Sequence, residues 1–209
     1  MSPAGAMQLA VALPAAASIP IVVTGRSPNL REAVTLITAT AVLILVGSTV
    51  PGVLAGERPE LTLLELLPGL DLTFRLEPLG MIFALVASFL WLVTSIYSIG
   101  YMRGHHEQNQ TRFYACFAVA IASALGVAFA GNMLTLFVAY EVLSLSTYPL
   151  VTHAGTEEAK RAGRLYLGIL MGTSIGFMLL AVIWTWNIAG TLDFREGGLL
   201  AGQIEGPAA

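Results

Sequence analysis

Six long apolar stretches make up most of this 209-residue chain and leave it few ways to fold. Each is long enough to cross a hydrocarbon core roughly 30 Å thick, which takes about 20 residues of helix. Backbone groups find no water inside a bilayer, so spanning segments of this kind must be helical. The stretches cover residues 7–24, 30–54, 78–101, 113–130, 133–151 and 162–188. The sequence therefore predicts an all-α membrane protein with about six transmembrane helices.

The composition agrees with a membrane location and excludes several other classes of protein. The chain is 56% hydrophobic and 11% charged, with a mean hydropathy of +0.77, whereas soluble domains have about 25% charged residues. A formal net charge of -3 gives no indication of nucleic-acid binding. Cys116 is the single cysteine, which excludes an internal disulfide or a cysteine metal cluster. Phosphate-binding loops and nucleophile triads are also missing, so we expect no cofactor, no metal and no redox site.

The loop charges predict an orientation. No Lys or Arg precedes the first stretch, so it is interpreted as a retained helix and not as a signal peptide. With both termini outside, the positive-inside rule is obeyed, because most basic residues then fall in inner loops. The inner ones are Arg26, Arg31, Arg103, Arg112, Lys160, Arg161 and Arg164, and the outer ones are Arg58, Arg75 and Arg195. We expect a multi-pass protein of a bacterial-type inner (plasma) membrane.

Residues 61–77 lie in the outer segment between the second and third stretches and follow a different period. Pro68-Gly69 marks a turn. Apolar residues then alternate with polar ones, which is typical of a strand. The sequence predicts a small external β-hairpin here.

Glu141 is the main candidate for function. It lies near the middle of residues 132–151, which are otherwise uncharged. A carboxylate at that depth costs about 3 kcal/mol on insertion scales, and such groups usually serve ion or proton movement. Ser144 at i+3 and Tyr148 at i+7 share its helix face, and Ser146 and Thr147 widen this face into a polar strip. The strip is a candidate access path for protons. The alternative is that Glu141 is a structural polar residue bonded to a neighbouring helix.

Several other residues are weaker candidates. Thr173 and Ser174 are the small hydroxyls in the middle of the sixth stretch and could face the fifth. Lys160 is interpreted first as a topology anchor, although a base at this inner mouth could also assist proton entry. His105 and His106 lack metal-motif spacing and are interpreted as solvated loop residues.

Small residues recur at every fourth position in the fourth and sixth stretches, a spacing that lets helices pack closely in lipid. They are Ala118, Ala122, Gly126 and Ala130, and then Gly168, Gly172 and Gly176.

Three segments together resemble a known family. They are Ser95-Ile-Tyr-Ser-Ile-Gly-Tyr-Met102, then Arg112-Phe-Tyr, and the run Gly131-Asn-Met-Leu-Thr-Leu-Phe-Val-Ala-Tyr-Glu-Val-Leu-Ser-Leu-Ser-Thr-Tyr148. The chain resembles the antiporter-like proton-translocating subunits of respiratory complex I, Mrp-type cation/proton antiporters and membrane-bound hydrogenases. The resemblance implies that Glu141 is a proton relay paired with a lysine on a seventh, broken helix. No residue here matches that lysine, and the chain ends after six helices where family members have about fourteen.

The resemblance divides the chain into five parts: the first two helices (1–54), the hairpin loop (55–77), the third helix with its inner loop (78–111), the start of the proton-translocating module (112–190) and an external tail (191–209). It implies a proton-conducting subunit, or its N-terminal part, of a complex I-like NADH:quinone oxidoreductase or Mrp-type antiporter. Its partners would be the lipid bilayer and other membrane subunits, including a chain that supplies the later helices. The alternatives are a non-conducting structural subunit or inactive fragment, and an unrelated small carrier.

Overall fold

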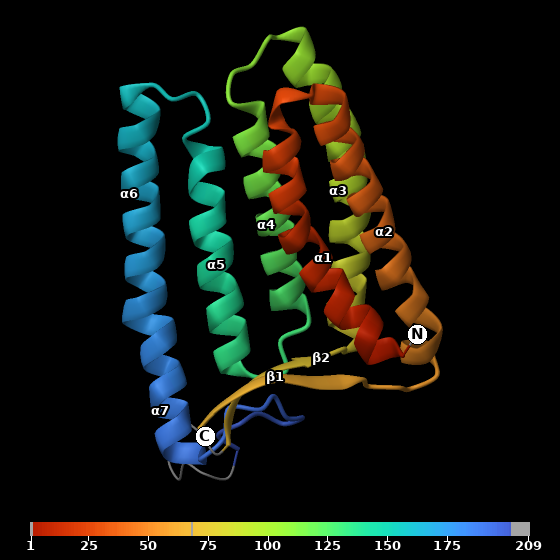
Figure 1. The fold of residues 1–209 in the computed structure, drawn as a ribbon. Helices are drawn as coiled ribbons and strands as arrows, with labels where there is room; N and C mark the ends of the chain where they lie inside the picture. Colours follow the sequence, from red (N-terminus) through yellow and green to blue (C-terminus); the bar gives the residue numbers. More distant parts are fainter. Residues whose placement is uncertain (1, 68, 202–209) are drawn as a thin grey trace.

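Six helical rods stand side by side in the computed structural model, which describes residues 2–67 and 69–201 (Figure 1). Each predicted span is confirmed, with boundaries that differ by a few residues at most ends. The first five rods are α1 (Pro3–Val23), α2 (Pro28–Leu54), α3 (Pro78–Gly104), α4 (Gln110–Ala128) and α5 (Met133–Val151). The sixth is continuous but has three parts: α6 (Glu157–Thr173), the π-helical η2 (Ser174–Leu179) and α7 (Leu180–Ala189).

Local sequence explains where these helices begin and end. Proline occupies the first helical position of α1, α2 and α3. A backbone N–H at this position would have no acceptor within the helix, so proline, which lacks the N–H, loses no hydrogen bond there. The Asn132 and Thr156 side chains cap α5 and α6 by accepting from the backbone N–H three residues on. Gly190 ends α7 with φ at 65°, a left-handed conformation that glycine adopts without a Cβ penalty.

The bundle has two distinct ends, which Figure 1 shows at the bottom and the top. The hairpin end carries the two strands, the start of α1 and the end of α7. The opposite end, called the basic end below, carries η1 (Thr24–Arg26) and the α3–α4 and α5–α6 connections. The seven basic residues predicted to be inner all belong to the segments at this second end.

The predicted hairpin is present as β1 (Glu60–Leu67) and β2 (Leu70–Arg75), which pair antiparallel. Leu67 pairs with Leu70, so the connection is confined to Pro68 and Gly69, of which Pro68 lies outside the described residues. Arg75 Nε donates to Glu60 Oε2 at 2.9 Å across the pair. That hydrogen bond raises the pKa of the Arg75 guanidinium above its ordinary value.

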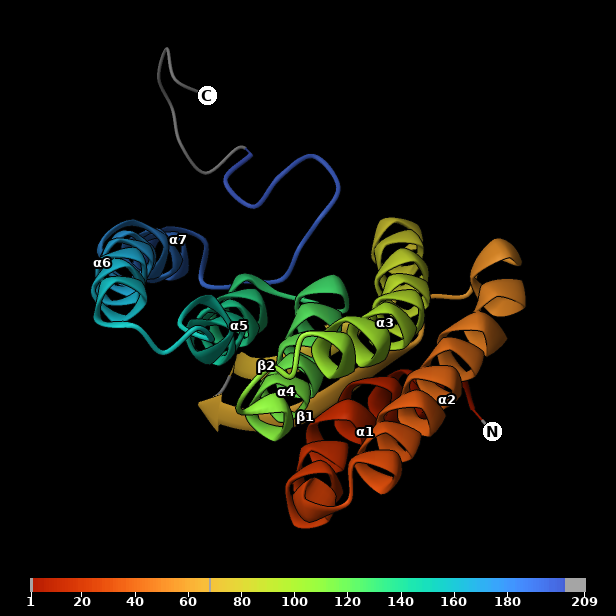
Figure 2. The ribbon, with the colours of Figure 1, turned by 90° about the horizontal axis from the view of Figure 1, so that it is seen from above.

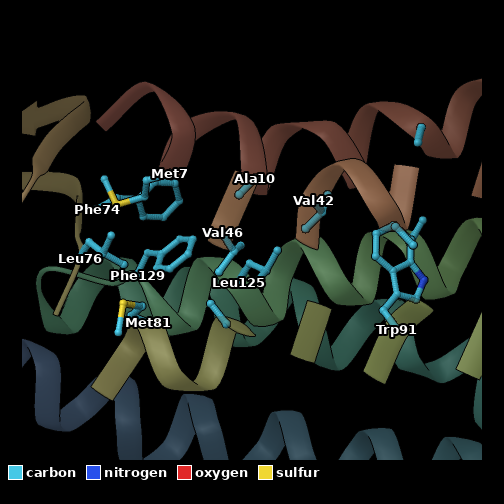
Figure 3. Close-up of a cluster of buried hydrophobic side chains, with 14 of the residues drawn as sticks. Met7, Ala10, Val42, Val46, Phe74, Leu76, Met81, Trp91, Leu125 and Phe129 are labelled. Atoms are coloured by element: carbon cyan, nitrogen blue, oxygen red, sulfur yellow. The ribbon is translucent and has the colours of Figure 1, made fainter. Parts of the chain in front are cut away.

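The apolar core lies among α1 to α4 and is closed at one end by the hairpin (Figure 3). Met7 of α1, Val42 of α2, Trp91 of α3 and Leu125 of α4 are almost wholly buried in it. Phe74 comes from the hairpin and packs into the same cluster.

Helices α5 and α6 lie outside this core, to one side of the other four, as the end-on view shows (Figure 2). Helix α5 buries only Thr135 and Ser144, and α6 buries only Gly163. Their remaining apolar surface is available to lipid or to other protein.

Asn132 joins the hairpin to the start of α5. Its side chain is 1% exposed. The Oδ1 atom accepts from Thr135 N at 2.8 Å, while Nδ2 donates to the Asp71 carbonyl at 2.9 Å. Thr73 N also donates to Thr135 Oγ1 at 2.8 Å. Strand β2 therefore holds the first turn of α5 through two independent side chains.

Replacing Asn132 should separate the two functions of its side chain. Asn132→Ala removes the cap, worth about 1 kcal/mol, and leaves the partly buried Asp71 carbonyl without this donor, at a further cost of up to about 1–3 kcal/mol. Asn132→Ser keeps a capping oxygen and loses only the bond to the hairpin, so its free energy of unfolding should fall between Ala and wild type. Denaturant titration in micelles measures the free energy of unfolding of each variant.

Asn187→Ala is the control, because Asn187 is exposed on α7 and bonds only to its own helix at Ile183 O. If Asn132→Ser unfolds like the wild type, the bond to Asp71 does not hold the hairpin to α5.

Candidate functional site

Glu141 occupies the middle of α5, as the sequence predicts. It follows the first helical residue, Met133, by eight positions, so it lies about 12 Å along a helix of 19 residues. Both carboxylate oxygens are buried, and neither has a hydrogen-bond partner among the described residues. The structural alternative, a carboxylate bonded to a neighbouring helix, is therefore not what these residues form. An unpartnered buried carboxylate is costly as an anion.

The hydroxyls near Glu141 donate to their own helix. Ser144 is buried and its Oγ donates to Tyr140 O at 3.0 Å. Thr147 Oγ1 donates to Ser144 O at 2.9 Å, and Ser146 donates to Leu143 O at 2.9 Å. Their protons are thus engaged, while their lone pairs remain free to accept. The polar strip exists, but none of its hydroxyls donates to the Glu141 carboxylate.

Helix α6 makes a close contact with the end of α5 at Gly163. A Cβ added there would overlap Thr152 Cγ2 and would lie 3.2 Å from Tyr148 Cε2. The two helices are antiparallel, so residues that lie equally far from this contact along α5 and along the sixth rod lie at about the same depth in the bundle. Glu141 lies 11 residues before Thr152, and Ser174 lies 11 residues after Gly163. Ser174 is therefore at about the depth of Glu141.

Ser174 and Thr173 differ in their surroundings. Ser174 is 5% exposed, and its Oγ donates to Met171 O at 3.1 Å. Thr173 is exposed, and its hydroxyl bonds to Ile169 O and Leu170 O of its own helix. Ser174 also opens the π-helical segment η2, a geometry often found at functional sites. The sequence carried no signal for this π-helical segment.

Lys160 lies at the basic end, far from Glu141. Its side chain is about half exposed and pairs with Glu157 Oε1 at 2.8 Å. It precedes Gly163 by three residues, whereas Ser174 follows Gly163 by eleven. About 14 residues of helix, roughly 21 Å, thus separate Lys160 from the depth of Glu141. The two side chains do not form a pair.

His153 is a residue that the sequence reasoning missed. It follows α5 at the basic end, and neither ring nitrogen has a hydrogen-bond partner among the described residues although both are buried. Its ring meets Phe113 edge to face at a centroid distance of 5.7 Å. Arg112 Nη2 donates to its carbonyl at 3.3 Å. His153 is thus a second side chain at α5 whose buried polar atoms have no partner among the described residues.

The two small-residue stripes have different outcomes. Ala118, Ala122 and Gly126 of α4 are buried, and a Cβ on Gly126 would lie 3.3 Å from Ala139 Cβ of α5. This stripe packs as predicted. Around Gly168, Gly172 and Gly176 of the sixth rod there is open space within 4 Å. The close helix packing predicted for these three glycines is not found within the described part of the chain.

Within residues 2–67 and 69–201, no three His, Cys, Asp or Glu side chains gather closely enough to hold a metal ion.

Six lipid-length helices with a carboxylate inside one of them define a multi-pass membrane protein. Two family models match the chain. One, described as the N-terminus of chain 5 of NADH-ubiquinone oxidoreductase (complex I), matches residues 69–114. The other, described as the transmembrane region of NADH:quinone oxidoreductase and Mrp antiporters, matches residues 130–205. The matches together span more than half of the chain, which belongs to this antiporter-like family of complex I and Mrp membrane subunits.

Individual relatives agree with this family. The chain is 32% identical over 121 residues to NADH-quinone oxidoreductase subunit N of Campylobacter jejuni, a match that covers 58% of this chain and 26% of the relative. It is 32% identical over 95 residues to a putative antiporter subunit, mnhA2, of Staphylococcus saprophyticus, covering 46% and 11%. The chain thus spans about a quarter or less of these relatives.

The solved Mrp complex from Dietzia sp. contains a chain with the same fold. Its TM-score is 0.77 at 22% identity, and the match covers 92% of this chain and 36% of that one. The protein is a multi-pass protein of the plasma membrane.

Gly163 should be essential for the approach of α6 to α5. Gly163→Ala forces a methyl group into Thr152 Cγ2, so we expect a loss of about 1–3 kcal/mol in unfolding free energy, as for other overpacked sites. Thr152→Ser removes that methyl and keeps the hydroxyl that donates to Tyr148 O. The double variant should therefore recover most of the loss in a double-mutant cycle.

Gly168→Ala is the matched control, since its added methyl meets open space. Equal losses for the two alanine variants, or no recovery with Thr152→Ser, would contradict the contact.

Proposed function

We propose that this chain is a proton-conducting antiporter-like subunit, or the N-terminal part of one, and that Glu141 is its membrane-buried proton relay. The observation that carries the proposal is the burial of both Glu141 oxygens without a hydrogen-bond partner among the described residues. Membership of the complex I and Mrp family supports it.

Both oxygens of this carboxyl are buried without a partner among the described residues. A buried carboxylate anion with no compensating partner is costly. A cation brought within about 4–6 Å would favour the anion and release the proton. A group whose protonation depends on the approach of a charge is suited to relay protons.

Among the described residues, no basic side chain pairs with Glu141. Lys160 is the single lysine of the chain and is paired with Glu157 at the basic end. We propose that a lysine on a later helix, in a longer chain or a partner subunit, approaches Glu141 from the exposed side of α5 and α6. The open space around Gly168 and Gly172 supports a helix neighbour on that side.

Proton access would come from the basic end. We propose that this end faces the cytoplasm and both termini face outside, as the concentration of basic residues there supports. Ser144, Thr147 and Tyr148 lie between Glu141 and that end of α5, and Ser174 lies across from Glu141 on the sixth rod. With their donors turned to the backbone, Ser144 and Thr147 offer acceptor lone pairs that can order water along this path.

Glu141→Gln should abolish coupled proton movement, because glutamine has similar shape but does not titrate. In vesicles containing the intact membrane assembly, we expect the initial rate of pH-dye quenching to fall at least tenfold, a conservative figure for a positioned proton-transfer group. Glu141→Asp retains a carboxyl and should keep part of the rate. Recovery of the assembled complex should be unchanged.

Glu158→Gln is the control, since Glu158 is an exposed carboxylate in the first turn of α6. It should pump like the wild type. Wild-type pumping by an assembled Glu141→Gln complex would overturn the relay and leave the chain a structural subunit.

A further inference from the structure

A polar hollow lies at the basic end, away from Glu141. It has a volume of about 610 Å³ and lies where the start of α2, the end of α3 and the start of α4 meet. Its walls are Ser27, Pro28, Asn29, Arg103, His106 and Gln110. The lining combines polar and apolar surface and contains no carboxylate side chain.

A buried ionic cluster lies beside the hollow. Glu32 accepts from Arg31 Nη2 at 3.0 Å and from Arg103 Nε at 3.1 Å, and it also pairs with Arg103 Nη2. Arg31 is 3% exposed and Glu32 is 5% exposed. Two guanidinium groups share one carboxylate, so the cluster keeps one net positive charge. A surplus charge beside this open hollow attracts an anion.

Several donors of this cluster remain unused. Arg103 lines the hollow with a side chain that is 45% exposed, and its Nη1 has no hydrogen bond within residues 2–67 and 69–201. Arg31 Nε is buried and likewise has no partner among them. Asn29 Oδ1 accepts from Arg103 Nη2 at 2.6 Å, which leaves the Asn29 amide N–H groups for another acceptor.

A separate, shallow apolar groove lies further along α2, on the helix face that carries Asn29. Its walls are Leu36, Ile37, Thr40, Ala41 and Ile44, and its volume is about 360 Å³. Leu36 and Thr40 follow Asn29 by 7 and 11 residues, so all three share one helix face. At 1.5 Å per residue the groove extends from about 10 to about 22 Å beyond Asn29. That is the region a lipid acyl chain occupies within a hydrocarbon core about 30 Å thick.

We propose that the hollow binds the phosphate of an anionic phospholipid, with one acyl chain lying in the α2 groove. Arg103 Nη1 and the Asn29 amide donate to phosphate oxygens, and the lipid charge balances the surplus of the Arg31–Glu32–Arg103 cluster. The groove distinguishes a lipid from a free phosphate ion, because only a lipid fills both spaces. Basic pockets between transmembrane helices are suited to such headgroups.

The test uses the full chain purified in a neutral detergent. Its thermal unfolding is followed while phosphatidylglycerol, phosphatidylcholine or inorganic phosphate is added. We expect phosphatidylglycerol to raise the midpoint at concentrations at least about tenfold below those at which phosphatidylcholine acts, with no effect of phosphate. Equal stabilisation by inorganic phosphate would show a free-anion site, and equal action of both lipids would show no headgroup site; either overturns the proposal.

Asn29→Asp sharpens the test. It keeps the oxygen that accepts from Arg103 and suits the N-terminus of α2, so the chain should fold. Its added negative charge should weaken phosphatidylglycerol binding at least about tenfold, since like charges in contact are strongly unfavourable. Gln108→Glu makes the same charge change at the same end, outside the hollow, and should bind like the wild type. Unchanged binding by Asn29→Asp contradicts the site.

Thr40→Trp fills the groove without touching the hollow. It should weaken phosphatidylglycerol binding and leave the preference over phosphatidylcholine intact. Unchanged phosphatidylglycerol binding by this variant would show that no acyl chain lies in the α2 groove.

Discussion

The hydrogen bonds of Asn132 fix where helix α5 begins, and the position of Glu141 depends on this starting point. One side chain caps α5 and holds the hairpin backbone at Asp71, and the neighbouring Thr135 hydroxyl holds Thr73. The segment after α7 joins the same point, because Met133 N donates to Leu192 O at 3.0 Å. Helix α5 has few buried residues of its own, so its start is held by polar bonds more than by an apolar core. The depth of Glu141 follows from this start, because helical rise is constant.

The chain therefore combines two kinds of structure. Helices α1 to α4 bury Met7, Val42, Trp91 and Leu125 in a shared core. At the basic end, the ion pair of Glu32 with Arg103 fastens α2 to α3. Helix α5 is joined to this unit by the bonds of Asn132 at its start and by the close contact between Gly126 of α4 and Ala139, and α6 contacts α5 at Gly163. Both helices leave apolar surface open, and α6 also leaves glycine surface open. A rigid scaffold with an open side suits a titratable group that responds to a neighbour. The family relationship agrees with this division, since relatives extend well beyond the matched region.

Much of the fold was predictable from local pattern. The six spans, the hairpin about Pro68-Gly69 and the buried Glu141 follow from hydropathy, turn chemistry and the cost of a charge in lipid. The small-residue stripe of α4 was also predicted, because spacing alone places Ala118, Ala122 and Gly126 on one face. The site was predicted only in part. Ser144 shares the face of Glu141, but its hydroxyl donates to Tyr140 O, a choice between competing acceptors that spacing does not determine.

The sequence by itself determined where the chain crosses the membrane and which span carries a carboxylate, because lipid obliges each apolar stretch to satisfy its own backbone. Tertiary structure alone decided which distant groups meet. Asn132 and Asp71 are 61 residues apart, Arg103 and Glu32 are 71 apart, and both bonds depend on how helices and hairpin pack. Packing also buries Ser174 and exposes Thr173, and it leaves His153 without a partner in the described structure. Such contacts depend on three-dimensional proximity, which no local pattern encodes.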